Sequence, residues 1–180
     1  MSERTPRNRE REPAPVAQLS LLDRLDDEAP DQLRDPPPSA GDSLAALRRN
    51  VRRDLEALLN TRRRWRSWPD RFTELALSPI GYGITDFAAG AFNDPARRDQ
   101  LRSEIEQTIR RFEPRLARVR VTLVEAGDRL DATLRLRVDA LLRTEPAPEP
   151  VAFDTLVDAA TAEIAVRANL SPRLQIPDDV

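Results

Sequence analysis

The spacing of the hydrophobic residues changes at Pro114, and this change constrains the fold more than any other feature of the sequence. Before it, apolar side chains recur every three or four residues, at Leu101, Ile105, Ile109 and Phe112. This spacing predicts a helix with Asp94 as its cap and Pro95 at its first position. After Pro114, apolar and polar residues alternate, at Val119, Val121 and Leu123, which predicts a strand with one buried face. A proline disfavours helical geometry in the residue before it, so Pro114 should end the helix.

Other segments show the same two periods. A cap-like stretch at residues 41–43 precedes apolar residues on one helical face, at Leu44, Leu47, Val51, Leu55 and Leu58, which predicts a helix to about Asn60. A turn-rich segment covers 61–94. After the first strand come a turn at 126–128 and a second strand at 130–138. A proline-rich break at 145–150 then leads to two short strands near 151–157 and 162–167. The order predicts an α+β fold, with N-terminal helices packed on a small, mainly antiparallel sheet.

The proline content divides the chain. Residues 1–41 hold seven of the 16 prolines, and we expect a disordered tail because such a stretch buries too little apolar area. Within it, SLLDRLDD at 20–27 follows Leu19 and places Leu22 and Leu25 at three-residue spacing. This island is either a chance cluster or a short linear motif that folds onto a groove of a partner. The predicted domain covers 42–170, and 171–180 is expected to be a loose C-terminal tail.

Composition excludes several classes of function. The chain has no cysteine and no histidine, so disulfides, zinc fingers and Ser-His-Asp or Cys-His catalysis are excluded. A net charge of -2 argues against a protein whose main task is to bind nucleic acid. We find no signal peptide and no apolar run near the roughly 20 residues that span a bilayer. A cytoplasmic location without direct membrane insertion is therefore expected.

Arginine is concentrated in one stretch, with eight arginines between Arg48 and Arg66. A phosphate-binding strip is one interpretation. A solvated helix face with some arginines in protein contacts is favoured, because acidic residues lie among them and no glycine-rich loop accompanies them. If the helix continued, Arg62 would return to its apolar face. Either the helix ends near Asn60, or Arg62 reaches a buried or interfacial carboxylate.

Carboxylates are the catalytic groups that remain, and none forms a convincing pair. Glu104 and Glu106 should point about 200° apart on their helix, so they cannot face one pocket. Glu113 lies at the helix-to-strand junction with Arg115 two residues later, where a Glu–Arg pair is more often a structural clamp than a general acid. We therefore expect no catalytic residue, no cofactor and no metal site.

Four motifs occur in an order and at spacings that resemble a known family. They are SLLDRL at 20–25, RRDLEALLNTRR at 52–63, SPIGYGITDF at 78–87 and FEPRL at 112–116. Together they resemble the TssE family of type VI secretion baseplate subunits, over roughly residues 19–168. Gly81 departs from the family pattern, which has asparagine before the Tyr-Gly pair.

The resemblance implies a structural baseplate component that links wedge to sheath and nucleates sheath assembly at the inner face of the cell envelope. It implies TssF, TssG and TssK as wedge partners, TssB and TssC as sheath partners, and the spike hub as a further candidate. In the family, the Glu-Pro-Arg element, here Glu113, Pro114 and Arg115, contacts the helical core of the wedge. The strands after it resemble a sheath subunit's sheet, on which the first sheath ring can dock, and an open sheet edge would suit strand addition. The interaction residues expected are these three with Arg62, Tyr82, Asp86, Leu22 and Leu25. Of these, Glu113 and Arg115 are expected to project at the junction as a solvated pair that a partner can bind, with an internal clamp as the alternative.

Three other functions remain as alternatives. A wedge protein of a phage tail baseplate belongs to the same class, and an anti-adaptor that regulates another protein would use the same fold. A peptidoglycan glycosidase is disfavoured because it would need export and a pair of catalytic carboxylates.

Overall fold

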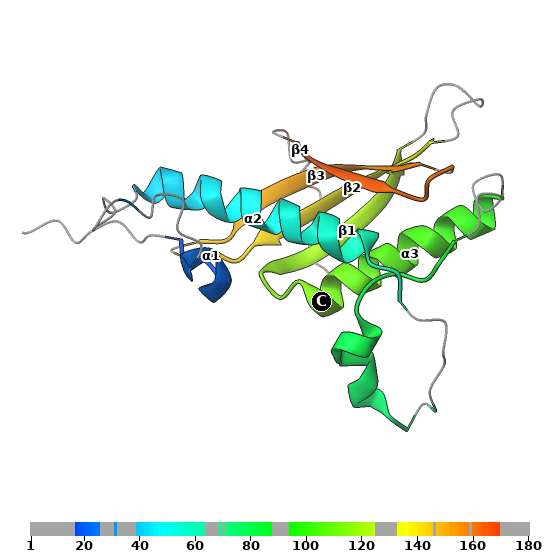
Figure 1. Ribbon diagram of the computed structural model, residues 1–180. Coiled ribbons are helices and arrows are strands. Elements are labelled where there is room, and N and C mark those ends of the chain that lie inside the picture. The colour runs from blue at the N-terminus through cyan, green and yellow to red at the C-terminus, as the bar shows by residue number, and fades with distance from the viewer. Residues whose placement is uncertain are drawn as a thin grey trace, which may run out of the picture.

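The computed structural model describes residues 17–25, 31, 39–63, 69, 71–87, 94–124, 133–145, 147–158 and 160–169. The elements come in the order predicted, helices before strands (Figure 1). They are the α-helices α1 (Leu21–Leu25), α2 (Ala40–Asn60) and α3 (Pro95–Phe112), the 3-10 helices η1 (Thr73–Leu77) and η2 (Pro79–Gly81), and the strands β1 (Leu116–Val124), β2 (Thr133–Leu142), β3 (Glu149–Asp158) and β4 (Ile164–Asn169).

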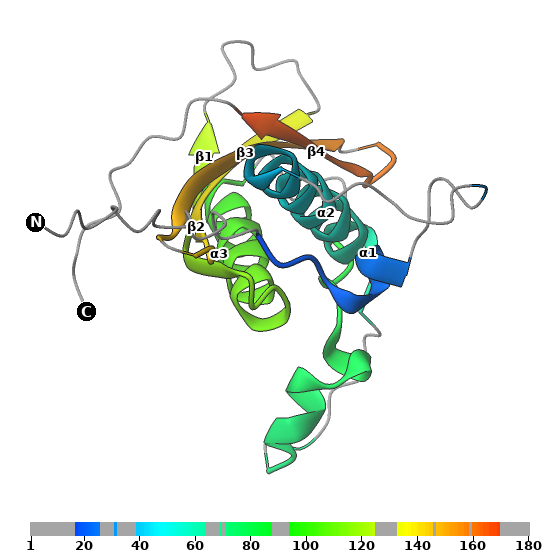
Figure 2. The same ribbon diagram turned by 90° about the vertical axis from the view of Figure 1, so that its left-hand side faces the viewer.

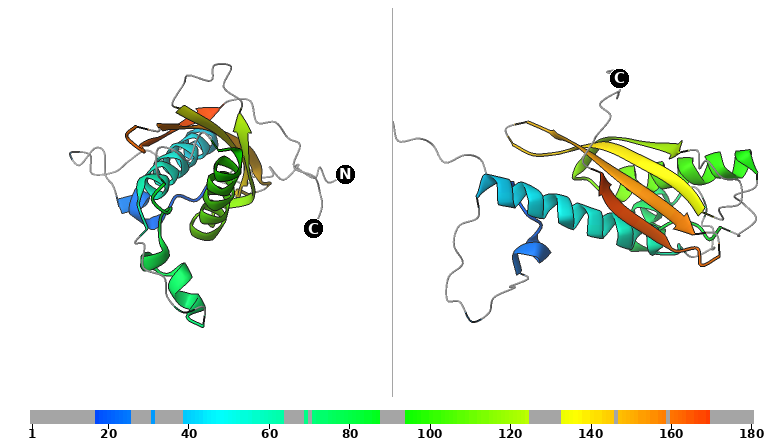
Figure 3. Two further views of the ribbon diagram at one scale, coloured as in Figure 1. Left: turned by 90° about the vertical axis from the view of Figure 1, so that its right-hand side faces the viewer. Right: turned by 90° about the horizontal axis from the view of Figure 1, so that it is seen from above.

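The strands form one antiparallel sheet in the order β1-β2-β3-β4, which confirms the α+β prediction. Both long helices lie on the same face of this sheet, as Figure 2 and the left view of Figure 3 show. Helix α3 packs mainly against β1, and α2 packs against β4. Each helix therefore accompanies one edge strand. None of the described helices combines the length and the apolar character needed to cross a membrane.

The core face of α2 is the one that the spacing predicted. Val51, Leu55 and Leu59 are at most 1% exposed. The helix begins at Ala40, slightly before the predicted cap at residues 41–43, because the Ser39 hydroxyl accepts a hydrogen bond from the Asp42 N–H at 3.1 Å. A serine in this position satisfies one of the free N–H groups of the first turn.

Helix α3 begins and ends as predicted. The Asp94 carboxylate accepts a hydrogen bond from the Ala96 N–H at 2.9 Å, and Pro95 is the first helical residue. The helix ends at Phe112, and Glu113 is its C-cap, directly before Pro114. The apolar face buries Leu101, Ile105 and Ile109 against the sheet.

A strand is found at each of the four predicted places, with changed boundaries. β1 and β2 alternate between buried and more exposed residues, and β2 continues past 138 to Leu142. β3 covers the strand expected at 151–157, whereas β4 begins two residues later than expected, at Ile164, and ends at Asn169. The predicted break at 145–150 is shorter, because Glu149 and Pro150 already pair with β2. β4 pairs with β3 only from Ala152 onward, so Pro150 has no strand on its other side and its missing N–H is tolerated.

The connection between α2 and α3 contains two 3-10 helices where we predicted turns. η1 and η2 project away from the helices and the sheet (Figures 1 and 2). A Cβ atom at Gly81 would lie 2.4 Å from the Ala76 carbonyl oxygen, so this backbone cannot accommodate the asparagine of the family pattern. Gly83 has a φ of +98°, which favours glycine, and a Cβ atom there would lie 2.3 Å from the Thr61 carbonyl oxygen.

Part of the predicted tail contacts the domain. Ala17 and Leu19 are half-buried against the core, and α1 follows directly after them. The boundaries at residues 41 and 170 stay a prediction. Trp65, Trp68, the turn at 126–128, the end of the 20–27 motif and the C-terminal tail at 171–180 lie outside the described residues.

Thr155 is a polar residue inside this core. It lies on β3 between Leu136 and Val166 in the register, and it is 1% exposed. Its hydroxyl has no hydrogen-bond partner among the described residues. A buried hydroxyl without a partner is destabilising, because it loses its bonds to water.

We therefore expect Thr155→Val to stabilise the chain by about 1 kcal/mol, a rise of a few degrees in Tm. Thermal unfolding of the purified full-length variant measures this. Thr122→Val is the control, because Thr122 is exposed on the opposite face of the sheet. A lower Tm for Thr155→Val would show that the hydroxyl is satisfied in the folded chain.

Candidate protein-interaction site

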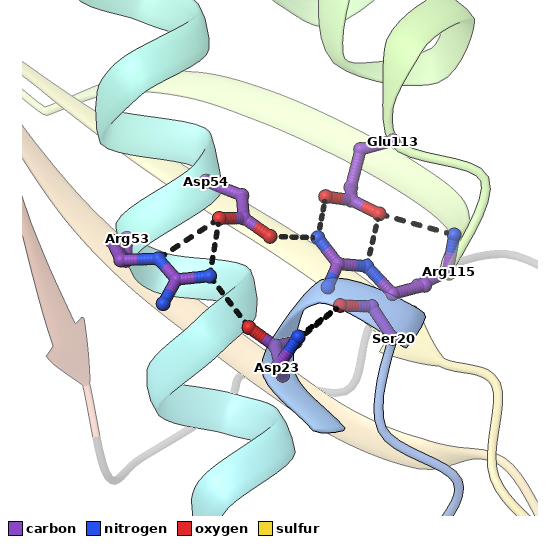
Figure 4. A network of polar contacts seen from close by, with 6 residues as sticks. All are labelled: Ser20, Asp23, Arg53, Asp54, Glu113 and Arg115. Carbon is purple, nitrogen blue, oxygen red and sulfur yellow. Dashed lines mark hydrogen bonds and ion pairs between the residues drawn. The ribbon is translucent and has the colours of Figure 1, made fainter. Parts of the chain in front are cut away.

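A chain of charged side chains connects α1, α2 and the junction between α3 and β1 (Figure 4). At the junction, Arg115 donates to both carboxylate oxygens of Glu113, with Nε at 2.7 Å from Oε1, and its Nη2 lies 2.6 Å from Asp54 Oδ2 on α2. The other Asp54 oxygen accepts from Arg53 at 3.0 Å, and Arg53 Nη2 lies 2.7 Å from Asp23 Oδ1 on α1. Negative and positive groups thus alternate across three elements.

The backbone explains why these groups meet. Pro114 ends α3, so Glu113 turns inward and is 4% exposed, while its carboxylate also accepts the Arg115 backbone N–H at 3.2 Å. Asp54 precedes the buried Leu55 and lies on the flank of α2. On α1, the Ser20 hydroxyl accepts the Asp23 N–H and donates to its carboxylate at 2.6 Å, a cap that orients Asp23 toward α2.

This geometry corrects the expectation that Glu113 and Arg115 project at the junction as a solvated pair. The Glu113 side chain is 6% exposed and the Arg115 side chain 23% exposed, and both are bonded within the chain. The pair is an internal clamp that joins the end of α3 to α2, because Asp54 supplies the second carboxylate. A role of Glu113, Pro114 and Arg115 in partner contacts stays a prediction.

The network shifts the pKa values of its members. The hydrogen bonds that Arg115 donates to Glu113 are the main reason that the pKa of the Arg115 guanidinium is raised; burial opposes the rise, and Asp54 adds to it. Burial alone would raise the pKa of Asp23, but hydrogen bonds from Ser20 and Arg53 lower it overall. The network therefore stabilises the charged forms of these two side chains.

Tyr82, one of the predicted interaction residues, lies beside this network. Its ring packs edge-on against Phe112, with centroids 5.3 Å apart. Burial raises the pKa of the Tyr82 phenol, and the negative charges of Asp54 and Glu113 raise it further. Tyr82 therefore reports on the charge state of the network.

The sequence left two alternatives for Arg62: the helix ends near Asn60, or Arg62 reaches a carboxylate. The structure shows the first. Helix α2 ends at Asn60, and Arg62 donates to the carbonyl oxygens of Leu59, at 2.9 Å, and Ala162. Its guanidinium also lies 4.9 Å from the centroid of the Phe87 ring. In the described part of the chain, Arg62 thus contacts two backbone carbonyls and an aromatic ring rather than a buried carboxylate.

The remaining predicted carboxylates are separated as expected. Glu104 accepts from the Thr85 N–H and hydroxyl at 2.7 and 2.6 Å, which attaches α3 to the connecting segment, whereas Glu106 faces β1. Asp86 is exposed one residue after Thr85. Within the described ranges, no three acidic residues are grouped so that they could hold a metal ion.

Helix α1 splits the leucine stripe that the sequence predicted. Leu22 and Leu25 are 73% and 80% exposed, but Leu19 lies before the helix and packs against the core. The three-residue spacing therefore does not place Leu19 on the same face as Leu22 and Leu25, because the helix begins only at Leu21. Leu21, which lies outside the stripe, is 75% exposed and completes an apolar surface on α1.

The structure also adds residues that sequence reasoning missed. Asp23, Arg53 and Asp54 join α1 to the junction, and the Ser-x-x-Asp cap at residues 20–23 was the one local signal for Asp23. A second exposed apolar group lies on and beside η1 and η2, at Phe72, Leu77 and Ile80. The sequence did not reveal this group, because the spacing of its residues follows 3-10 helices and matches neither the α-helical nor the strand period.

Both edge strands are bonded to helix side chains. On β1, the Val121 N–H donates to Glu106 and the Val119 carbonyl accepts from Arg110, both on α3. On β4, Asn60 of α2 bonds both backbone groups of Ile164. The open edge expected from the sequence is therefore closed over the middle of β1 and at the start of β4.

The internal clamp predicts a loss of stability when either member is changed. We expect Arg115→Ala to destabilise the isolated chain by about 3 kcal/mol, because it leaves the buried Glu113 carboxylate unpaired. Glu113→Gln should destabilise it by less, because Asp54 still pairs with Arg115. Thermal and urea unfolding of the purified variants measure this. The exposed Arg49→Ala is the control. Near-native Tm values of both variants would contradict the internal clamp and would support a solvated pair instead.

Tyr82 is the only tyrosine, so its titration can be followed directly. We expect the tyrosinate absorbance to appear above the ordinary pKa of 10.0, and Asp54→Asn to lower the midpoint toward that value, because one negative charge is removed. Since the raised pKa keeps the phenol neutral in the folded chain, stability should fall as the pH rises through this range. Asp42→Asn, at the far end of α2, should leave the midpoint unchanged. If Asp54→Asn leaves the titration midpoint of Tyr82 unchanged, the charge of Asp54 does not influence the pKa of Tyr82.

Comparison with known proteins completes the description. A family model described as baseplate wedge protein gp25 matches residues 45–147, which is more than half of the chain. The matched region runs from α2 to the segment before β3 and includes Asp54, Glu113 and Arg115. No curated protein matches the chain. TssE belongs to the matched family, so the resemblance drawn from the four motifs is confirmed at this level. The chain belongs to the baseplate wedge protein gp25 family, whose members have a structural role in the baseplates of contractile tails.

Proposed function

We propose that this chain is the baseplate subunit of a type VI secretion system that links the wedge to the sheath and nucleates sheath assembly. Two observations support the proposal. Family membership assigns a structural baseplate role, and the four motifs occur in the order found in TssE. SLLDRL at 20–25 lies outside the matched residues and favours the secretion baseplate.

The observation that carries the proposal is the contrast within α1. Its Asp23 side chain is 3% exposed and ion-paired to Arg53, whereas its three leucines are at least 73% exposed. A tethered helix that presents large apolar side chains to solvent is typical of a protein-interaction site, since water contact with them is unfavourable. The network thus supports α1 as a docking element held in place before a partner binds.

The partners proposed for this surface are the wedge subunits TssF, TssG and TssK. The sheath subunits TssB and TssC would approach the sheet, and the spike hub is a further candidate. Assembly at the cytoplasmic side of the cell envelope follows from this role. A structural subunit of this kind needs no cofactor and catalyses no reaction.

A phage tail wedge protein is the second candidate, because the family match applies equally to contractile phage tails. The anti-adaptor and glycosidase alternatives have less support, since the family is structural. Co-purification distinguishes the first two: a secretion subunit should bind TssF and TssG.

We expect Leu22→Ser with Leu25→Ser to abolish co-purification with TssF and TssG and to stop fluorescent sheath subunits from forming foci in cells. Both side chains are exposed, so the Tm of the isolated variant should stay within about 1 °C of the original, as is usual for exposed positions. Arg24→Ala, an exposed change on the same helix, is the matched control. Normal foci in the double variant would contradict the proposal.

A further inference from the structure

The two edges of the sheet are closed in different ways. On β1, three side chains of α3 bond the outward-facing backbone: Glu106 accepts the Val121 N–H at 2.9 Å, Arg102 donates to the Val121 carbonyl at 3.4 Å, and Arg110 donates to the Val119 carbonyl at 2.7 Å. These three side chains also pair with one another, Arg110 with Glu106 at 2.8 Å and Arg102 with Glu106 at 3.5 Å. A charged network therefore holds this edge.

A backbone irregularity adds to the protection of β1. Its pairing with β2 shifts between Ala117 and Arg120, and Arg118 inside this bulge has a φ of 50°. Bulges and charges on an edge strand both hinder the approach of another strand.

The β4 edge depends chiefly on Asn60. The side-chain oxygen of Asn60, Oδ1, accepts the Ile164 N–H at 2.9 Å, and the side-chain Nδ2 donates to the Ile164 carbonyl at 2.7 Å. One side-chain amide thus makes the two bonds that a residue of a neighbouring strand would make. Arg52 adds one bond, to the Val166 carbonyl at 3.2 Å.

The position of Asn60 allows its side-chain amide to replace the two hydrogen bonds of a neighbouring strand. It is the last residue of α2, and α2 runs along β4 (Figures 1 and 3). The same Nδ2 also donates to the Glu56 carbonyl at 2.8 Å, which fixes the amide against the end of the helix. Arg62 bonds Ala162 just before the strand begins, so the helix end and the strand start are held together.

We propose that Asn60 closes the β4 edge against strand addition and keeps this chain from pairing with a second copy of itself. An edge with free N–H and C=O groups is a template for another strand. Without Asn60, both groups of Ile164 lose these bonds. The proposal does not depend on the proposed baseplate function.

A second copy fits the exposed edge by symmetry. In an antiparallel pair of β4 strands centred on Val166, Ile164 of each copy faces Ala168 of the other, so all three outward-facing residues find partners. On the face opposite the helices, Arg167 of each copy then lies across from Ala165 of the other. The two arginines are therefore not directly opposed.

The test is the oligomeric state of the purified full-length chain, measured by sedimentation equilibrium over a range of concentrations. We expect the original chain to be a monomer and Asn60→Ala to form a dimer, with a dissociation constant at least about tenfold lower. Arg49→Ala, an exposed change on α2, should remain a monomer. A dimer of the original chain, or a folded monomer of Asn60→Ala, would overturn the proposal.

A second change tests whether the dimer uses β4. Ala168 is exposed at the open end of the strand, and proline there removes an outward N–H that does not pair with β3. Adding Ala168→Pro to Asn60→Ala should therefore return the chain to a monomer, and a persisting dimer would overturn the proposal. Should Asn60→Ala not fold, Asn60→Asp carries the test, because it keeps the acceptor for the Ile164 N–H and loses the donor; a folded monomer of that variant would then overturn the proposal.

Discussion

The arrangement of the two helices depends on Arg115, whose guanidinium lies between the carboxylates of Glu113 and Asp54. This side chain joins the junction between α3 and β1 to the middle of α2, where Asp54 lies 61 residues earlier in the sequence. Buried carboxylates are costly unless they are paired, so the position of each helix limits that of the other. Through Arg53, the same network extends to α1 and sets where its exposed leucines lie.

A similar division of tasks appears at the sheet. The apolar faces of α2 and α3 cover one side of it, while polar residues on their flanks bond the edges. Each helix therefore contributes both to the core and to the closure of an edge strand. For a subunit of a large assembly this is useful, since an unprotected edge would compete with specific contacts. Among the described residues, most of the large apolar side chains that stay exposed lie on α1 and around η1 and η2.

Much of the fold could be predicted because its signals are local. Pro114 ends a helix through its own ring, Asp94 and Pro95 start one, and alternation along β1 and β2 follows from a sheet with one buried face. The site was predicted less well. Glu113 and Arg115 were found as a pair, but their burial depends on Asp54, which lies 61 residues from Arg115 and has no periodic signal of its own. Leu19 was assigned to the wrong group because α1 begins after it.

The sequence by itself determined the elements, their order, the α+β class and the family, since helix caps, prolines and hydrophobic periods act within a few residues. It also excluded the chemistry of histidine and cysteine. Only the tertiary structure decided which charges are paired and which strand edges are closed. An arginine or an asparagine has the same local pattern whether its partner is water or a distant backbone group. Packing α2 beside β4 and α3 beside β1 is what brings Asn60 to Ile164 and Glu106 to Val121, because those contacts exist only once the helices lie on the sheet.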